Sequence, residues 1–166
     1  MRALFFIVCM ALQGAALAQL PLVPDSLMSG ANEVVLEDKT VFEIFSIDRS
    51  RFTRTYKAVI LNRQASRYNN VLLHYNDFRK IVKAEAKVTD INGKEIESYR
   101  LKDFDDYGMD GGSLITDGRA KYISVDDQSY PIIMDVAYTI DFSGSLFYPS
   151  WRPQLEKAAV VQASFE

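Results

Sequence analysis

The segment DFDDYGMDGG, residues 103–112, holds four aspartates and three glycines and is the densest group of potential metal ligands or catalytic acids in the chain. A calcium-binding EF-hand loop needs oxygen ligands at positions 1, 3 and 5, glycine at position 6 and a bidentate glutamate at position 12. Asp103, Asp105 and Gly108 fit positions 1, 3 and 6, but Leu114 occupies position 12. The ligand that closes the calcium cage is absent, and we interpret the segment as a solvated turn between two strands.

The same segment could instead supply a pair of catalytic carboxylates. Glycoside hydrolysis needs two acids held at a fixed separation across a cleft, and Asp103, Asp105, Asp106 and Asp110 all lie here. Such pairs usually come from different structural elements, so an ordinary acidic surface is favoured. A hydrolase built on these aspartates stays open as the weaker alternative.

His74 is the only histidine, so any Ser-His-Asp site would have to use it. The chain has no Gly-x-Ser-x-Gly sequence for the nucleophile of such an enzyme, and a histidine-based zinc site lacks further ligands. The glycine turn at Gly111-Gly112 has no phosphate-loop lysine. We therefore predict no catalytic residue, no cofactor and no metal site.

The segment SLFYPSWRPQ gathers Phe147, Tyr148 and Trp151 beside Arg152. Exposed aromatic side chains next to an arginine are typical of a recognition surface for a sugar, a peptide or a neighbouring domain. Alternatively these rings close one end of the domain, and burial is favoured for Trp151 because large apolar side chains mostly lie in cores. Tyr148, Trp151 and Arg152 form our candidate interaction surface, together with Arg119, which could form an ion pair or contact a ligand.

Residues 1–18 have the three parts of a secretory signal peptide: Arg2, the apolar run Ala3–Leu12 and small residues that end at Ala18. The apolar run is well below the ~20 residues that span a bilayer. We predict cleavage after Ala18 and a periplasmic or secreted protein that is not inserted in the membrane. Cleavage also removes Cys9, the only cysteine, which excludes a disulfide, a thiolate metal site and a cysteine nucleophile from the mature chain.

The composition of the mature chain favours one small acidic domain. It carries 22 acidic residues against the 18 basic ones that are left when Arg2 is removed from the total of 19. This balance does not favour nucleic acid as a partner. Roughly 150 residues suffice for one domain with a core of its own. We expect a single domain over 32–166 after an extended arm over 19–31, where prolines and a glycine interrupt any periodicity.

Apolar and polar residues alternate along several segments, with the period of two that is typical of half-buried strands. One such segment places Val82, Ala84, Ala86 and Val88 on one face, and the following Asn92-Gly93 predicts a hairpin turn.

A second alternating segment, 132–142, predicts a long strand in the centre of its sheet. A third, 51–61, is broken on its apolar side only by Arg54. Shorter strand candidates are VVLE, VFEIFSI, NVLLHY, KYISV and KAAVVQASF, and a turn or two of helix is expected at most around 76–80. The sequence predicts an all-β fold, an antiparallel sandwich or partly open barrel with little helix.

Three stretches, in this order and spacing, resemble the exported bacterial domain of unknown function 3857: HYNDFRKIVKAEAKVTDINGKEI, LKDFDDYGMDGGSLITDGRAKYISV and QSYPIIMDVAYTIDFSGSLFYPSWRPQ. The resemblance covers roughly residues 32–166. Members of that family typically place this β-rich domain directly before a transglutaminase-like domain with a Cys-His-Asp site. The resemblance therefore implies a protein partner or a neighbouring domain of that class.

Two features of this chain depart from that pattern. No transglutaminase-like sequence follows within it, and the mature part has no cysteine, so no catalytic residue is carried over. The family domain also continues beyond Glu166, so we expect a truncated domain whose last segment, KAAVVQASF, leaves an unpaired edge.

These observations together predict a non-catalytic, exported β-sandwich module with an interaction or structural role beside a transglutaminase-like protein. The alternative from another class is a free-standing protein that binds a glycan or a peptide.

Overall fold

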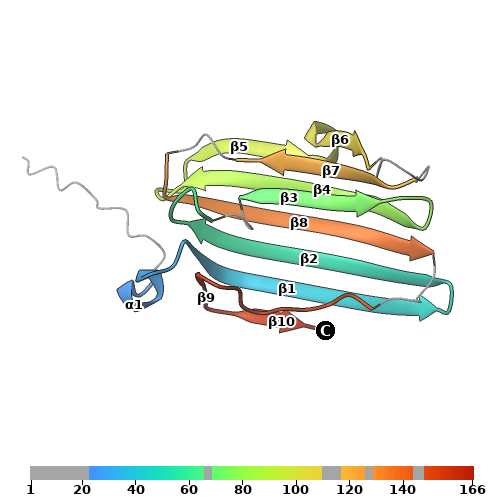
Figure 1. Ribbon diagram of the computed structural model, residues 1–166, viewed down its shortest axis with the longest axis horizontal. Helices are drawn as coiled ribbons and strands as arrows, with labels where there is room; N and C mark the ends of the chain where they lie inside the picture. Colours follow the sequence, from blue (N-terminus) through green and yellow to red (C-terminus); the bar gives the residue numbers. More distant parts are fainter. Residues whose placement is uncertain (1–22, 66–68, 110–116, 126–128, 144–147) are drawn as a thin grey trace, which may run out of the picture.

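The computed structural model describes residues 23–65, 69–109, 117–125, 129–143 and 148–166, which form a sandwich of two β-sheets (Figure 1). The larger sheet contains β1 (Glu33–Ser46), β2 (Arg49–Ile60), β4 (Arg79–Asp90), β5 (Glu95–Arg100), β8 (Ile132–Ser143), β9 (Ala158–Val160) and β10 (Ala163–Phe165). The smaller sheet contains β3 (Asn70–Tyr75), β6 (Asp105–Gly108) and β7 (Arg119–Ser124). The all-β prediction is confirmed, and of its two alternatives the sandwich is the one observed.

The large sheet has the order β10-β1-β2-β8-β4-β5, and β9 also pairs with β1. β8 lies between β2 and β4 and is antiparallel to both, as its long alternating pattern predicts. Its residues Ile132, Met134 and Val136 are buried on the face that meets the small sheet, called here the inner face. β8 is therefore the central strand of the sandwich.

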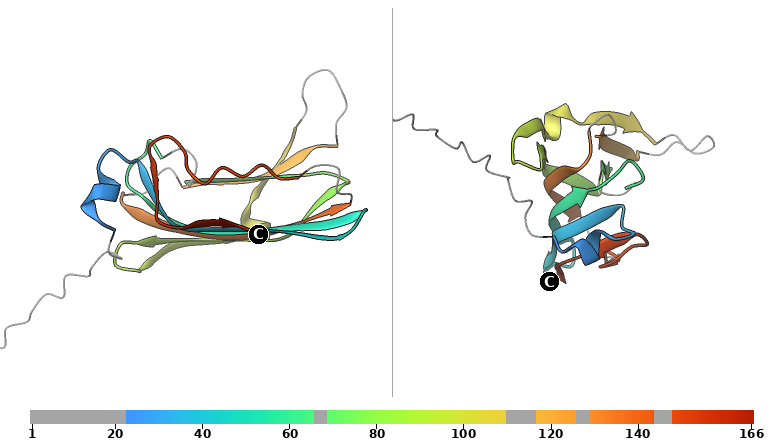
Figure 2. Two further views of the ribbon diagram at one scale, coloured as in Figure 1. Left: turned by 90° about the horizontal axis from the view of Figure 1, so that it is seen from below. Right: turned by 90° about the vertical axis from the view of Figure 1, so that its left-hand side faces the viewer.

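The small sheet, in the order β3-β7-β6, supplies the other side of the core (Figures 1 and 2). Val71 and Leu73 of β3 and Ile123 of β7 are buried in one cluster with the inner residues of β8. Burial of these side chains holds the two layers together because each removes apolar surface from water.

The connection from β3 to β4 differs from the prediction. In place of a helical turn around 76–80, Asn76 and Arg79 form an antiparallel bridge, with N–H to oxygen distances of 3.0 and 3.2 Å. The side chain of Asn76 also accepts a hydrogen bond from the Phe78 N–H at 3.0 Å. This local bond favours a tight turn over a helix, and the turn carries the chain from one sheet to the other.

The hairpin between β4 and β5 confirms the Asn-Gly prediction. Gly93 has a φ of +82°, which a glycine adopts without steric cost. The Asp90 N–H donates to the Lys94 carbonyl at 2.9 Å and closes the turn.

One residue of β4, Val82, does not lie on the face predicted for it. Val82 is 52% exposed, because the register with β8 shifts between Ile81 and Lys83. This bulge adds one residue to β4, so that Ile81 lies opposite Ile140 and takes the inner position expected for Val82.

Both ends of the described chain pack at the β1 side of the large sheet. The arm expected to be extended contains one helical turn, α1 (Asp25–Met28), and Met28 packs beside Val34, Val59 and Ile133 on the outer face. The segments VVLE and VFEIFSI are joined in the single strand β1. The last segment forms β9 and β10, both parallel to β1. Within the residues that the structure describes, no helix is long and apolar enough to cross a membrane.

Candidate functional site

The inner face of the large sheet is longer than the layer that covers it. β2 and β8 have 12 residues each, whereas β3 and β7 have 6 each. Because every strand rises by about 3.3 Å per residue, the cover reaches along only about half of the sheet. On this face Ile132, Met134 and Val136 are buried, whereas Tyr138 and Phe142, toward Ser143, are only partly buried.

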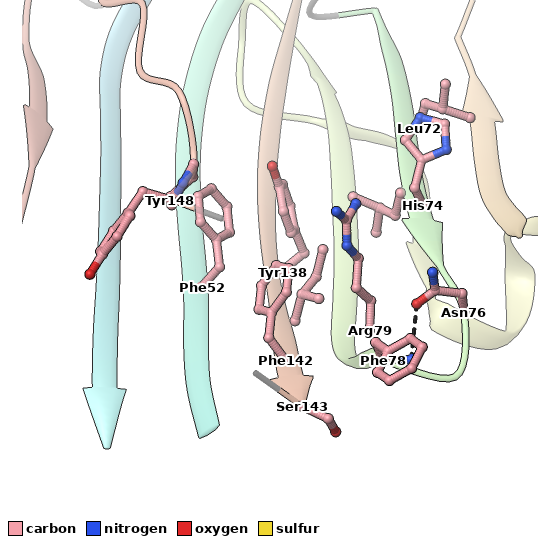
Figure 3. Close-up of a pocket in the computed structure, with 13 residues that line it drawn as sticks. Phe52, Leu72, His74, Asn76, Phe78, Arg79, Tyr138, Phe142, Ser143 and Tyr148 are labelled. Carbon is pink, nitrogen blue, oxygen red and sulfur yellow. Dashed lines mark hydrogen bonds between the residues drawn. The ribbon is translucent and has the colours of Figure 1, made fainter. Parts of the chain in front are cut away.

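An open groove of about 550 Å³ lies over this uncovered half (Figure 3). Its floor contains Phe52 from β2 and Tyr138, Ile140 and Phe142 from β8. Alternate residues of a strand point to the same face, so all four side chains reach the inner face. The rings of Phe52 and Tyr138 stack with their centroids 5.9 Å apart. The floor is an apolar, aromatic surface of the kind that lines ligand-binding clefts.

Two walls border the groove (Figure 3). Leu72 of β3 and Phe78 of the β3–β4 turn lie on one side, and Tyr148 lies on the other. Their exposed fractions are 52%, 65% and 71%. The Tyr148 ring meets the ring of Phe42 in β1 edge-on at 5.9 Å, which anchors this wall to the large sheet.

A second hollow of about 200 Å³ adjoins the groove and is lined in part by Arg54, the residue that breaks the apolar pattern of β2. Its Nε and Nη2 donate to the two carboxylate oxygens of Asp38 at 2.9 and 2.5 Å, and its guanidinium lies 5.0 Å from the centre of the Tyr56 ring. Burial alone would lower the pKa of Arg54, but the hydrogen bond to Asp38 and the contacts with Tyr138 raise it above its ordinary value. The buried Arg54 side chain therefore stays charged.

The described residues that line the two hollows include two arginines, Arg79 and Arg54, and no aspartate or glutamate. The guanidinium of Arg79 lies 5.6 Å from the centre of the Phe142 ring. Among the described residues, Arg54 is paired with Asp38 and no ion pair is found for Arg79. The groove thus suits an apolar ligand that also carries a negative group.

The four residues of the predicted interaction surface lie in different places. Tyr148 borders the groove. Trp151 contacts Phe165 of β10 at 6.1 Å between ring centroids and is 42% exposed, so the burial favoured for it is not observed. Arg152 is exposed, and Arg119 lies in β7 of the small sheet. Of the four, Tyr148 is the one that lines the groove.

Arg119 belongs to a polar cluster that joins all three strands of the small sheet. Its Nε donates to the Tyr75 hydroxyl at 2.8 Å and to Asp106 at 3.1 Å. Lys121 also lies 3.3 Å from Asp106. Hydrogen bonds from Tyr75, and then from Lys121 and Arg119, lower the pKa of Asp106. Of the two roles open to Arg119 from the sequence, the structure shows the ion pair.

The aspartate-rich segment is not simply a solvated turn, which corrects that prediction. Asp103 accepts a hydrogen bond from the Arg100 N–H at 2.8 Å in the 3₁₀ turn η1 (Leu101–Asp103). The Phe104 side chain is buried in the core, and the next four residues form β6. Asp110, with Gly111 and Gly112, lies outside the described residues. Over the ranges that the structure describes, no group of three His, Cys, Asp or Glu residues could hold a metal ion.

The floor residues Phe52, Tyr138 and Phe142 were not among the predicted site residues. Their alternating positions marked Phe52 and Phe142 as inward-facing, and inward-facing aromatic residues are normally core. The available signal was the unequal length of the strands. NVLLHY and KYISV are far shorter than 132–142, so their sheet could not cover the whole of β8.

The family model for DUF3857, a domain of unknown function with a solved structure, matches residues 48–166. This chain belongs to the DUF3857 family. The match begins in the turn between β1 and β2 and includes the groove floor, both walls and β10. The recognition made from the three sequence stretches is therefore confirmed.

The fold also resembles a crystal structure from Parabacteroides distasonis described as a "putative protease". The likeness has a TM-score of 0.57 at 10% sequence identity and covers 70% of this chain. It covers 24% of the Parabacteroides protein, so the two share a fold over about a quarter of that longer chain. A comparison with the curated proteins gives no match.

Proposed function

We propose that this DUF3857 chain is a non-catalytic, exported interaction module that docks onto a transglutaminase-like protein through its open groove. The observation that carries the proposal is the aromatic floor left uncovered between Leu72, Phe78 and Tyr148. Contiguous apolar surface of this kind on a folded protein marks a binding surface, because leaving it in water is unfavourable.

The small share of the Parabacteroides protein that the common fold covers supports a docking role. The shared fold is 24% of a chain whose description names a protease, and the family resemblance implies a transglutaminase-like neighbour. A β-rich module that accompanies a catalytic domain needs a surface to meet it, and the groove is such a surface. The signal peptide that the sequence predicts would export the module to the compartment in which these relatives are expected.

The residues in the groove support binding in preference to catalysis. Ser143 and His74 both line it, but they lie apart in Figure 3. The Nδ1 atom of His74 is 3.1 Å from the Met109 sulfur. Among the described lining residues no carboxylate is available to orient a histidine or to act as an acid, which acid–base catalysis would require.

Titration of the mature chain with a purified transglutaminase-like domain of a family member tests the proposal. Phe142→Ala removes part of the floor, and Thr55→Ala is the matched control because Thr55 is exposed on the opposite face of the neighbouring strand. We expect binding that Phe142→Ala weakens at least about tenfold and Thr55→Ala leaves unchanged. Absence of binding, or equal binding by both variants, would contradict the proposal.

The rival function, a free-standing glycan or peptide binder, is separated by the same titration. A free-standing binder would ignore the transglutaminase-like domain and would lose affinity for a small ligand on Tyr148→Ala. The hydrolase alternative has a direct assay: turnover of a glycan or peptide substrate that disappears when Asp103, Asp105 and Asp106 are replaced by Asn would overturn the non-catalytic assignment.

A further inference from the structure

The edge of β3 faces the groove. β3 pairs with β7 along its whole length, and no second partner strand for it is found in the described part of the chain. Leu72, Leu73 and His74 line the groove, and Asn70 to Leu73 line the adjoining hollow. A stretch of main chain therefore runs along one side of both cavities.

Hydrogen bonds at the two ends of β3 show which backbone groups point to that edge. The Val125 N–H donates to the Asn69 carbonyl at 3.0 Å, so Asn69 faces the β7 side. Asn76, at the other end, exchanges backbone bonds with Arg79 on the opposite side. Backbone direction alternates along an antiparallel strand, so the N–H and C=O groups of Leu72 and His74 share the side of Asn76 and face the groove.

The course of β4 leaves these groups without a neighbouring strand. After Arg79 the chain leaves the small sheet and pairs with β8 in the other layer. The hairpin therefore separates after one bridge, and the position beside β3 that β4 would have filled lies above the aromatic floor. An edge strand with unpaired backbone groups is a template for a further strand.

We infer that the groove receives an extended segment of the partner protein, which adds as a strand along Leu72 and His74. Every second side chain of this segment is apolar and packs on the Phe52 and Phe142 rings. One acidic side chain meets Arg79. Main-chain bonds supply affinity in this mode, and the pockets for alternate side chains supply specificity. The inference rests on the proposed function and names the chemistry of the partner.

The groove fits a single extended segment better than a second copy of this chain. Tyr148 borders the groove on the side opposite β3 (Figure 3). If β3 of another copy paired here, the β7 strand beside it would extend toward this wall. An isolated segment has no adjoining strand and lies in the channel between the two walls.

Selection of random heptapeptides from a displayed library on the mature chain provides the probe. Peptides are kept when they bind wild type and Thr55→Ala but not Phe142→Ala. We expect the kept sequences to alternate apolar and polar residues and to contain Asp or Glu. Arg79→Glu should weaken their binding at least about tenfold, while Lys83→Glu, a change of the same charge on the outer face of β4, should have no effect.

Backbone pairing is measured on the wild-type protein, so that no variant needs to fold. A saturating peptide should slow hydrogen exchange of the Leu72 and His74 amides at least about tenfold and leave the amide of Ser164, in β10 at one edge of the large sheet, unchanged. Methylation of alternate peptide nitrogens should weaken binding at least about tenfold for the set that faces β3 and less than twofold for the other set.

Three results would overturn the inference. The first is a peptide whose binding needs Phe142 but which leaves hydrogen exchange at Leu72 and His74 unchanged. This result would exclude strand addition but would still support the groove as a docking site. The second is a selection in which no peptide loses binding on Phe142→Ala. This result would exclude an extended peptide ligand, and the titration with the transglutaminase-like domain would still test docking. The third is a dimer in which both amides are already protected without peptide, which shows that a second copy occupies the edge.

Discussion

The two halves of the inner face are built by the same strands and behave differently. In the half near Ile132 the inward residues of β2 and β8 are fully buried beneath the small sheet. In the half near Ser143 the same alternation continues through Tyr138 and Phe142, but their side chains line an open groove. The pattern of residue types is continuous, so the difference comes from the cover. One half serves the core, and the other is available for binding.

The boundary between the halves is marked by the buried pair of Arg54 and Asp38. A charged pair inside a sheet contributes little net stability compared with apolar residues of the same volume, but removing one partner leaves a costly buried charge. Arg54 of this pair lines the small hollow that adjoins the groove.

Removal of Asp38 should have the largest effect on stability. The Asp38 side chain is 5% exposed and that of Arg54 is 18% exposed, so Asp38→Ala removes the carboxylate partner of a buried cation and should cost about 3–5 kcal/mol in the free energy of unfolding. Urea denaturation measures this. The double variant Asp38→Leu with Arg54→Met should recover most of the loss. An Asp38→Ala variant as stable as wild type would contradict the role of Asp38 as the partner of a buried cation.

Side-chain truncations in the two halves should lower the free energy of unfolding by different amounts. Met134 is fully buried in the covered half, so Met134→Ala should lower the free energy of unfolding by about 2–5 kcal/mol. Phe142 is only partly buried, and Phe142→Ala should cost about 1 kcal/mol. Thermal and urea unfolding of both variants test the comparison. Equal losses would show that the groove half is packed like the core.

Asp106 should contribute a small, pH-dependent stability to the small sheet. Its folded pKa is lowered by the Tyr75 hydroxyl and the neighbouring cations. The contribution is therefore present above the unfolded pKa of about 3.9 and is lost as the pH falls through the folded value.

The unfolding free energies of wild type and Asp106→Asn should accordingly differ at about pH 7, and the difference should shrink as the pH falls below the unfolded pKa of about 3.9. Asp105→Asn is the control, because Asp105 neighbours Asp106 and no ion pair is found for it among the described residues. A difference between wild type and Asp106→Asn that does not change with pH would show that the ion pairs are not its source.

Strands with long, regular alternation were predictable from the sequence. β8 and the β4–β5 hairpin follow from period two and from Asn92-Gly93, because each strand is fixed by its own pattern and turn. The bulge at Val82 was not predictable, since it depends on the register between β4 and β8. The turn at 76–80 was likewise not predictable. It connects strands of two different sheets, and its own residues do not determine how those sheets are arranged.

The candidate site was predictable only in part. Tyr148 was identified from the aromatic residues and the arginine beside it in the sequence, whereas the floor residues have the alternating pattern of core residues. Whether an inward aromatic residue is buried depends on the length of another sheet, and the local pattern does not contain that information. The aspartates attracted attention by their density, but Asp103 and Asp106 have local structural partners.

The central claim, that the open half of the inner face is the binding surface, is tested most directly by hydrogen exchange of the whole mature chain with and without a transglutaminase-like domain. We predict slower exchange in β3 around Leu72 and His74 and in the groove half of β8 around Phe142, with no change in β10. Protection confined to β10 or to the outer-face segments around α1, with the groove unchanged, would contradict the account.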